Sequence, residues 1–334
     1  MLKPYVLGID IGGTNTVFGI VDARGQVIAS DSIKTKKHSK FDDYLEDLCH
    51  GIQHLLEKNE AEGKIQGIGI GAPNANYYTG EILNPPNLPW GEPVIPLAEK
   101  VSKALGLPVA VTNDANAAAL GEMTYGAARG MKDFIMITLG TGVGSGIVVN
   151  GQLVYGHDGF AGELGHLIMK RNNGRMCGCG RTGCLEAYCS ATGVARTARE
   201  FLEVRTEPST LRDLQIEDIT SKDVYDAAVA GDKLAQEIFT YTGTILGEAF
   251  ADMVTFTSPQ AIILFGGLAK SGELLMKPLQ EAFDKSLMPV FKGKTKILLS
   301  ELKESDAAVL GASALGWEAK YRSDNAGMEN TASE

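Results

Sequence analysis

The sequence predicts an α/β fold that is divided into two domains of related topology. Apolar strands alternate with helical patterns along the chain, which is typical of a largely buried sheet covered by helices. A pattern of strand, Gly/Thr-rich turn and strand begins at Val6 and returns at Phe134. The chain has 334 residues, enough for two domains, so the repeat indicates two related domains that face one another.

The first half is predicted from short apolar runs and one long helical pattern. Apolar residues recur at helical spacing between Phe41 and Leu56, which predicts an amphipathic helix over 41–59. A second helix is expected over 115–125. Strands are expected at 5–10, 16–21, 65–71 and 108–112.

The second half alternates between helices and strands after the repeated hairpin. Helices are expected at 190–203, 222–230, 233–256, 272–286 and 306–321. Strands are expected at 261–265 and 295–299. The segment 322–334 is polar and lacks apolar periodicity, so we expect a frayed or disordered tail there.

Composition and charge narrow the class of protein. Hydrophobic residues make up 44% and charged residues 22%, which is ordinary for a soluble globular protein. The net charge of −10 disfavours nonspecific binding to nucleic acid or to an anionic membrane. The chain has no run near the roughly 18 apolar residues of a spanning helix, and its start lacks a secretion signal. We expect a cytoplasmic protein without nucleic-acid or membrane partners.

A cluster of His and Cys residues carries the most specific chemical signal. One His and three Cys fall within nineteen residues, and three thiolates with one imidazole are the ligand set of a closed tetrahedral zinc site. Disulfides or buried free thiols are the alternatives, and disulfides would need an oxidising compartment. Two carboxylates, Glu163 and Glu186, flank the cluster without being needed as ligands. The proposed zinc ligands are His166, Cys177, Cys179 and Cys184, whereas Cys49 and Cys189 read as ordinary core residues.

Two Gly-rich turns occupy equivalent places in the repeat. They read Asp10-Ile-Gly-Gly-Thr-Asn15 and Leu139-Gly-Thr-Gly-Val-Gly144. Glycine lets backbone N–H groups approach a phosphate closely, and threonine hydroxyls add donors. One such turn is weak evidence because tight hairpins also need glycine, but two in a duplicated context favour phosphate binding. Asp10, at the end of a strand, can hold Mg²⁺ through water.

A third motif, Thr112-Asn-Asp-Ala-Asn116, lies between a predicted strand and a predicted helix. The functional interpretation makes Asp114 a general base for a substrate hydroxyl, oriented by Asn113. The alternative is that one of these two side chains only caps the helix. Phosphoryl transfer needs little more than such a base, together with a metal ion and correct positioning.

Taken in order, these motifs resemble the ROK family of bacterial sugar kinases, sugar-responsive repressors and related proteins. The resemblance runs from about residue 5 to 320 and includes Phe265-Gly-Gly. It implies a two-domain actin/hexokinase-like (ribonuclease H-like) fold, with sugar and ATP in the cleft between the domains. We expect a smaller N-terminal domain over 1–115, joined by helix 306–321, and a larger domain over 116–305 that carries the zinc motif.

The resemblance also implies roles for individual residues. Asp114 matches the catalytic base, and His166 serves both zinc and sugar. The implied sugar ligands are Asn87, Asn113, Asp114, Glu163, His166 and Glu186. The implied nucleotide-binding residues are Gly12, Gly13, Thr14, Asn15, Thr141, Gly142, Gly266 and Gly267. The implied cofactors are ATP, Mg²⁺ and a structural Zn²⁺, and the implied assembly is a homodimer.

One loop departs from the family pattern and leaves the sugar open. The family commonly has Gly-x-Pro-Gly-x-Val-Asp where this chain has Gly71-Ala-Pro-Asn-Ala-Asn-Tyr-Tyr78. Asn74 in place of glycine is either a change in the sugar site or a harmless turn variant, since Asn tolerates left-handed backbone. We expect an ATP-dependent glucokinase of carbohydrate metabolism that feeds glycolysis. N-acetylglucosamine, N-acetylmannosamine, mannose, fructose and allose are alternative substrates.

Two functions of other classes are weighed against a kinase. A sugar-sensing regulator of the same family carries a helix-turn-helix ahead of the first strand, whereas only nine residues precede Asp10 here. An ATPase module of the chaperone or actin type would not need a zinc cluster flanked by carboxylates. A hexose kinase is therefore the expected function.

Overall fold

The computed structural model describes residues 4–85 and 87–331, which form two compact units. The first unit comprises residues 1–130, 153–161 and 301–334, and the second comprises 131–152 and 162–300. The chain therefore passes from one unit to the other four times. The segment 153–161 leaves the second unit, joins the first and returns.

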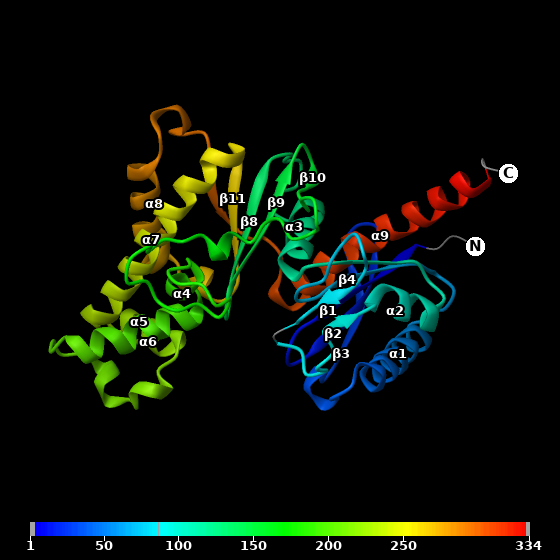
Figure 1. Cartoon of the computed structure of the whole chain (residues 1–334), viewed down its shortest axis with the longest axis horizontal. Coiled ribbons are helices and arrows are strands. Elements are labelled where there is room, and N and C mark those ends of the chain that lie inside the picture. The colour runs from blue at the N-terminus through cyan, green and yellow to red at the C-terminus, as the bar shows by residue number, and fades with distance from the viewer. Residues whose placement is uncertain (1–3, 86, 332–334) are drawn as a thin grey trace. The chain divides into compact units, whose positions relative to one another are not determined.

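The first unit is built on a five-stranded sheet whose strand order is β3-β2-β1-β4-β7 (Figure 1). The first three strands are antiparallel, and β1, β4 and β7 are parallel. This mixture follows from the connections, because β1 to β3 are joined by tight turns whereas α1 and α2 separate the parallel strands. The strands are β1 Tyr5–Ile11, β2 Thr16–Asp22, β3 Val27–Ile33, β4 Ile65–Gly71 and β7 Val109–Thr112.

Helices cover both faces of this sheet. Leu7 and Ile9 of β1 pack with α1 in one apolar cluster, whereas Val6 packs with Val309 of α9 in another. The split follows the strand period of two, which sends successive side chains to opposite faces. The elements of this unit outside its main sheet are η1 Thr35–Lys37, α1 Phe41–Lys58, β5 Ile82–Leu83, β6 Val94–Ile95, α2 Leu97–Leu105, α3 Asp114–Tyr125 and α9 Glu304–Thr331.

Helix α9 lies unusually close to the sheet because glycines line its path. A Cβ atom built on Gly69 would lie 1.9 Å from the carbonyl oxygen of Ala312, and one on Gly8 would lie 2.1 Å from that of Val309. Gly67 approaches Gly316 in the same way, with 2.4 Å to its carbonyl oxygen. These glycines are therefore required by the helix that covers them rather than by any turn.

The second unit repeats the topology of the first. Its sheet has the order β10-β9-β8-β11-β12, in which β8 and β9 form an antiparallel hairpin and β8, β11 and β12 are parallel. The core between this sheet and its helices is one large apolar cluster. The strands are β8 Phe134–Leu139, β9 Val143–Val149, β10 Gln152–Leu153, β11 Ala261–Phe265 and β12 Lys296–Leu299.

The helices of the second unit follow the expected order. They are η2 Leu164–His166, α4 Glu186–Cys189, α5 Ala191–Val204, η3 Thr210–Asp213, η4 Ile216–Asp218, α6 Ser221–Val229, α7 Lys233–Thr257, η5 Leu268–Ser271, α8 Glu273–Ser286 and η6 Pro289–Phe291. Each long helix lies within a few residues of its expected bounds, because its apolar residues recur at helical spacing.

The structure differs from the sequence expectation at several points. Strand β3 and helix α2 were not expected, since β3 is half-exposed and rich in polar residues and α2 is short. The first unit extends to residue 130 rather than 115, because α3 packs on α9. Helix α9 continues to Thr331, so most of the expected disordered tail is helical, and residues 332–334 lie outside the described residues. Its last turns need only local backbone hydrogen bonds, which polar residues do not prevent.

Candidate active site and metal centre

Two carboxylates meet at the carboxyl edge of the first sheet. Asp10 of β1 pairs in register with Gly71 of β4, which in turn pairs with Thr112 of β7. Asp114 follows β7 as the first residue of α3. A Cβ atom on Gly71 would lie 3.6 Å from both Oδ1 of Asp10 and Cα of Asp114. Gly71 therefore lies next to both aspartates.

Burial raises the pKa values of both carboxylates, and repulsion by Asp114 adds to the shift of Asp10. Desolvation raises the pKa of Asp10 from 3.8 to about 7, and the charge of Asp114 adds to the effect. Desolvation also raises the pKa of Asp114, although the side chain keeps solvent-accessible surface and the N–H of Ala115 opposes the shift. Carboxylates with raised pKa values are stronger bases, and clusters of such groups are typical of functional sites.

Asn113, the N-cap residue of α3, and Asp114, its first residue, divide the roles between them. The side chain of Asn113 accepts a hydrogen bond of 2.9 Å from the N–H of Ala115, which is the N-cap contact. Oδ1 of Asp114 accepts from the same N–H at 2.8 Å. Because Asn113 already caps the helix, the carboxylate of Asp114 is not required for that purpose.

The first Gly-rich turn joins β1 to β2 beside these carboxylates. The N–H of Gly12 donates to the carbonyl of Asn15 at 3.0 Å, which closes the turn over Gly13 and Thr14. A Cβ atom on Gly13 would lie 2.6 Å from the carbonyl oxygen of Asn87. The structure thus brings the predicted sugar ligand Asn87 against the predicted phosphate turn, and only glycine fits at the contact.

The second unit holds an equivalent pair of turns at the carboxyl ends of β8 and β11. The N–H of Gly140 donates to the carbonyl of Gly142 at 3.0 Å, and the carbonyl of Thr141 accepts from the hydroxyl of Thr192 at 2.9 Å. Gly266 has φ +106°, and a Cβ atom there would lie 2.5 Å from the carbonyl oxygen of Leu139. These turns therefore lie side by side. At Gly267 no atom lies within 4 Å of a Cβ position among the described residues, so its backbone is open to a ligand.

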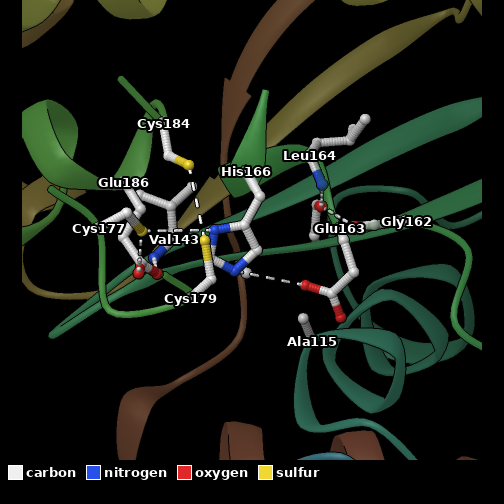
Figure 2. Close-up of polar contacts among 12 residues, drawn as sticks. Ala115, Val143, Gly162, Glu163, Leu164, His166, Cys177, Cys179, Cys184 and Glu186 are labelled. Atoms are coloured by element: carbon white, nitrogen blue, oxygen red, sulfur yellow. Dashed lines mark hydrogen bonds and ion pairs between the residues drawn. The ribbon is translucent and has the colours of Figure 1, made fainter. Parts of the chain in front are cut away.

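The four predicted metal ligands converge in the second unit (Figure 2). Their ligand atoms all lie within 4.8 Å of one another. Sγ of Cys179 lies 3.7 Å from Sγ of Cys184, and Sγ of Cys177 lies 3.6 Å from Nδ1 of His166. A tetrahedron with Zn–S near 2.3 Å and Zn–N near 2.1 Å has S···S edges of about 3.8 Å and S···N edges of about 3.6 Å. The donor set and its spacing therefore fit zinc.

The thiols are free, and burial favours the neutral form of two of them. The 3.7 Å between Cys179 and Cys184 is far beyond a disulfide bond. Burial raises the pKa of Cys177 to about 12 and also raises the pKa of Cys184. A metal ion reverses this effect because it binds the thiolate form.

His166 presents its two ring nitrogens to different partners. Nδ1 points towards the thiols, whereas Nε2 lies 3.9 Å from Oε2 of Glu163 (Figure 2). The predicted double role of His166 therefore has a geometric basis, since one nitrogen can bind metal while the other remains for substrate. The side chain of Glu163 is 58% exposed and so is accessible to a substrate.

Glu186 links residues 163–186, which we call the metal loop, to the second Gly-rich turn. Its Oε2 accepts from the N–H of Val143 at 2.9 Å, and its Oε1 accepts from the thiol of Cys177 at 3.6 Å. A Cβ atom on Gly142 would lie 2.5 Å from Oε2 of Glu186. Glycine at position 142 thus makes room for a carboxylate that the sequence assigned to sugar binding.

Two positioning residues were not anticipated from the sequence. Ser145 of β9 donates to the carbonyl of Gly162 and accepts from the N–H of Leu164 at 3.0 Å, so it holds the backbone on both sides of Glu163. Arg175 is buried, donates to Glu200 at 2.6 Å and stacks on Tyr188, with its guanidinium carbon 4.5 Å from the ring centroid. Neither lies in a recognisable motif, and only the fold brings them to these partners.

The unusual loop after β4 adopts the backbone that glycine would adopt. Asn74 has φ +54°, and its amide donates to the carbonyl of Leu83 at 3.0 Å. The harmless-turn interpretation therefore accounts for the backbone at this position. The next residues have a different role, because Asn76 is 3% exposed and donates to the carbonyl of Asp158 at 2.6 Å.

Two tyrosines continue this contact with the segment 153–161. The ring of Tyr77 stacks on Tyr155, with centroids 3.6 Å apart and planes 8° apart. The hydroxyl of Tyr78 donates to the carbonyl of Gly156 at 2.9 Å. We call Asn76, Tyr77 and Tyr78 the Asn-Tyr-Tyr clamp, because the three side chains hold the segment that precedes Glu163.

Comparison with known proteins identifies the family. The ROK family model matches residues 6–319, and the chain belongs to this family. The glucokinase of Halalkalibacterium halodurans is 35% identical over 328 residues, covering 97% of this chain and 98% of that protein. No helix among the described residues combines the length and the apolar character needed to cross a membrane.

Solved structures agree with this assignment and with the expected actin/hexokinase-like α/β fold. A ROK family glucokinase from Streptomyces griseus, solved with glucose and AMPPNP, has a TM-score of 0.76 and 32% identity, covering 94% of this chain and 99% of that one. A ROK family transcriptional regulator, a homologue of the E. coli MLC protein, has a TM-score of 0.84 and 27% identity. It is matched over 96% of this chain and 79% of its own.

Proposed function

We propose that this protein is an ATP-dependent hexose kinase and that glucose is its preferred substrate. The observation that carries the proposal is the pair Asp10 and Asp114, placed around Gly71 at the edge of the first sheet. A glucokinase that is 35% identical over nearly the whole chain supports the same activity. The transfer joins a sugar hydroxyl oxygen to the γ-phosphorus of ATP and releases ADP.

Asp114 acts as the general base in this proposal. Its carboxylate accepts the proton of the sugar 6-hydroxyl as the oxygen attacks, and desolvation makes it a stronger base by raising its pKa. Asn113 fixes the start of α3 and so holds Asp114 in place. The gain from such a base is typically about 10² to 10⁴ in rate.

The two carboxylates take different roles because their surroundings differ. Asp10 would hold Mg²⁺, which in phosphoryl transfer neutralises charge on the phosphate oxygens. The phosphates of ATP would bind at the two Gly-rich turns, Gly12–Asn15 and Thr141–Gly142. The adenosine would lie nearest to Gly266 and Gly267. The structural Zn²⁺ would lie between His166 and the three thiols, apart from the chemistry.

Three side chains of the metal loop would form hydrogen bonds with sugar hydroxyls, namely those of Glu163, His166 and Glu186. A site built from hydrogen bonds rejects a sugar that lacks a paired hydroxyl more strongly than it rejects a small apolar change. We favour an unmodified hexose because an N-acetyl group needs extra room beside the C2 position.

A coupled-enzyme assay against a panel of sugars tests the proposal. Glucose should give the highest kcat/KM among glucose, mannose, fructose, allose, N-acetylglucosamine and N-acetylmannosamine. An N-acetyl sugar that wins by tenfold or more overturns the choice of glucose but not the kinase. Failure to phosphorylate any sugar, by protein that contains metal and is folded, overturns the kinase itself.

A further inference from the structure

Lys34 lies beside the first phosphate turn, although no motif includes it. Strand β3 ends at Ile33, which pairs in register with Thr16, the first residue after the turn. The ammonium group of Lys34 follows directly and donates to Oδ1 of Asn15 at 2.8 Å. Asn15 is itself one of the predicted nucleotide-binding residues, so Lys34 reaches the rim of the turn.

A buried hydroxyl cluster fixes the backbone around Lys34. The hydroxyl of Thr35 lies 2.9 Å from that of Thr16, which lies 2.8 Å from the hydroxyl of Tyr44. All three side chains are fully buried. The residue after Lys34 is therefore anchored to the residue after Asn15, which holds the lysine side chain at this end of the turn.

The positive charge of Lys34 is not balanced by a carboxylate within the described residues. Its neighbours Lys37 and His38 both contact Asp47, at 3.1 and 2.8 Å. Lys34 instead contacts a neutral amide, and none of the ion pairs found in the described part of the chain includes it.

We propose that Lys34 binds the terminal phosphates of the nucleoside triphosphate at the Gly12–Asn15 turn. An ammonium group has three N–H donors, and Asn15 occupies one of them, so two remain for phosphate oxygens. Positioned donors that meet developing negative charge stabilise a phosphoryl-transfer transition state. The proposal rests on the proposed kinase function and adds a cationic contact to it.

The test compares Lys34→Met with Lys36→Met in the full-length, metal-loaded protein. Lys36 is an exposed lysine two residues away, so its variant makes the same change in charge and length. Lys34→Met should lower kcat/KM for MgATP at least tenfold while the dissociation constant for sugar stays within twofold. Lys34→Arg should recover part of the loss, and Lys36→Met should behave like the wild type.

Binding of inorganic tripolyphosphate, measured by calorimetry, separates this proposal from the kinase assignment. The wild type should bind tripolyphosphate at least fivefold more tightly than Lys34→Met, and the difference should shrink at high salt. Equal affinity for both proteins, with Tm values within 2 °C, overturns the role of Lys34 whether or not a sugar is phosphorylated. A wild type that binds tripolyphosphate through Lys34 but phosphorylates no sugar instead overturns the proposed function alone.

Discussion

Asp10 and Asp114 both lie next to Gly71, and the charge of Asp114 raises the pKa of Asp10. Asp10 lies near the end of β1 and Asp114 follows β7 as the first residue of α3, and β4 separates the two strands in the sheet. Two carboxylates that interact in this way favour one proton or one cation between them. We therefore expect the site to respond both to pH and to Mg²⁺.

Stability should depend on pH through Asp10. Its pKa is 3.8 ordinarily and about 7 in the fold, so the folded state binds the proton more tightly than the unfolded state. The free energy of unfolding should therefore fall as pH rises from about 4 to about 7, by up to about 4 kcal/mol from this group. Asp10→Asn stays neutral and should lose this slope, which chemical denaturation at a series of pH values measures.

Magnesium should oppose this loss of stability. Added Mg²⁺ should raise the Tm of the wild type at pH 8 and leave that of Asp10→Asn unchanged. Equal pH slopes for the two proteins in the absence of metal would show that Asp10 is not the group responsible.

Asp114→Asn should separate catalysis from helix capping. Turnover should fall by about 10² to 10⁴, because the amide cannot accept the hydroxyl proton. The fold and the sugar dissociation constant should stay close to those of the wild type, since Asn113 supplies the cap. Near-normal turnover in a clean preparation contradicts the role of Asp114 as base.

The purified protein should contain about one zinc per chain, as measured by elemental analysis. Cys184→Ser should lose the zinc, lower the Tm and weaken sugar binding together, because the metal loop carries His166 and Glu186. Cys49→Ser is the matched control, since Cys49 is a free thiol in the first unit and should keep the metal. Active wild-type protein without zinc would rule out this centre.

Gly69→Ala should destabilise the first unit strongly. The new Cβ atom would lie 1.9 Å from the carbonyl oxygen of Ala312 and 2.7 Å from the N–H nitrogen of Gly316, so α9 must shift. A cost of about 3 kcal/mol is expected for such overpacking. Gly63→Asn is the control, because Gly63 faces open space with φ +67° and asparagine tolerates that backbone. Similar unfolding midpoints for the two variants would contradict the close packing of α9.

The Asn-Tyr-Tyr clamp should matter more through its buried member than through its exposed one. Asn76→Ala removes a hydrogen bond to Asp158 and two acceptor contacts to the N–H groups of Tyr78 and Thr79. It should cost about 2 to 4 kcal/mol, because three hydrogen bonds of about 0.5 to 1.5 kcal/mol each are lost from a side chain that is 3% exposed. Tyr78→Phe loses only one contact at a side chain that is largely exposed and should cost less than about 1 kcal/mol. Urea denaturation measures the free energy of unfolding of both variants. A larger decrease for Tyr78→Phe than for Asn76→Ala would contradict the greater importance of the buried residue.

Much of the fold was predictable because its signals are local. Helix α1 and helix α7 follow from residues recurring at helical spacing, and the hairpins of both units follow from glycine turns between apolar runs. The strand β3 lacked such a signal, since its burial depends on pairing with β2 rather than on an apolar pattern. The close approach of α9 to the sheet was also not predictable, because the sequence does not distinguish the glycines that contact this helix from other glycines in strands.

The site divides in the same way. The His–Cys cluster stands in one compact motif whose residue types indicate metal binding, so the sequence predicted that its four side chains converge. Asp114 also stands in a compact motif, whose residue types indicate a general base. The excursion of residues 153–161 was not predictable, since it depends on Asn76 and two tyrosines some 80 residues earlier in the chain. Ser145, Arg175 and Lys34 are common residue types, and only the fold brings them to the partners described above.

The path of α9 over a glycine-lined sheet also sets an order of events during synthesis. A ribosome completes residues 131–300, and with them the whole second unit, before the residues of α9 emerge. Until then one face of β1 and β4 is not covered by α9, and its backbone at Gly8, Gly67 and Gly69 is exposed to water. The first residues to be translated therefore belong to the unit that is completed last. A chain interrupted near residue 300 would contain all residues of the second unit but would lack the helix that covers the sheet of the first.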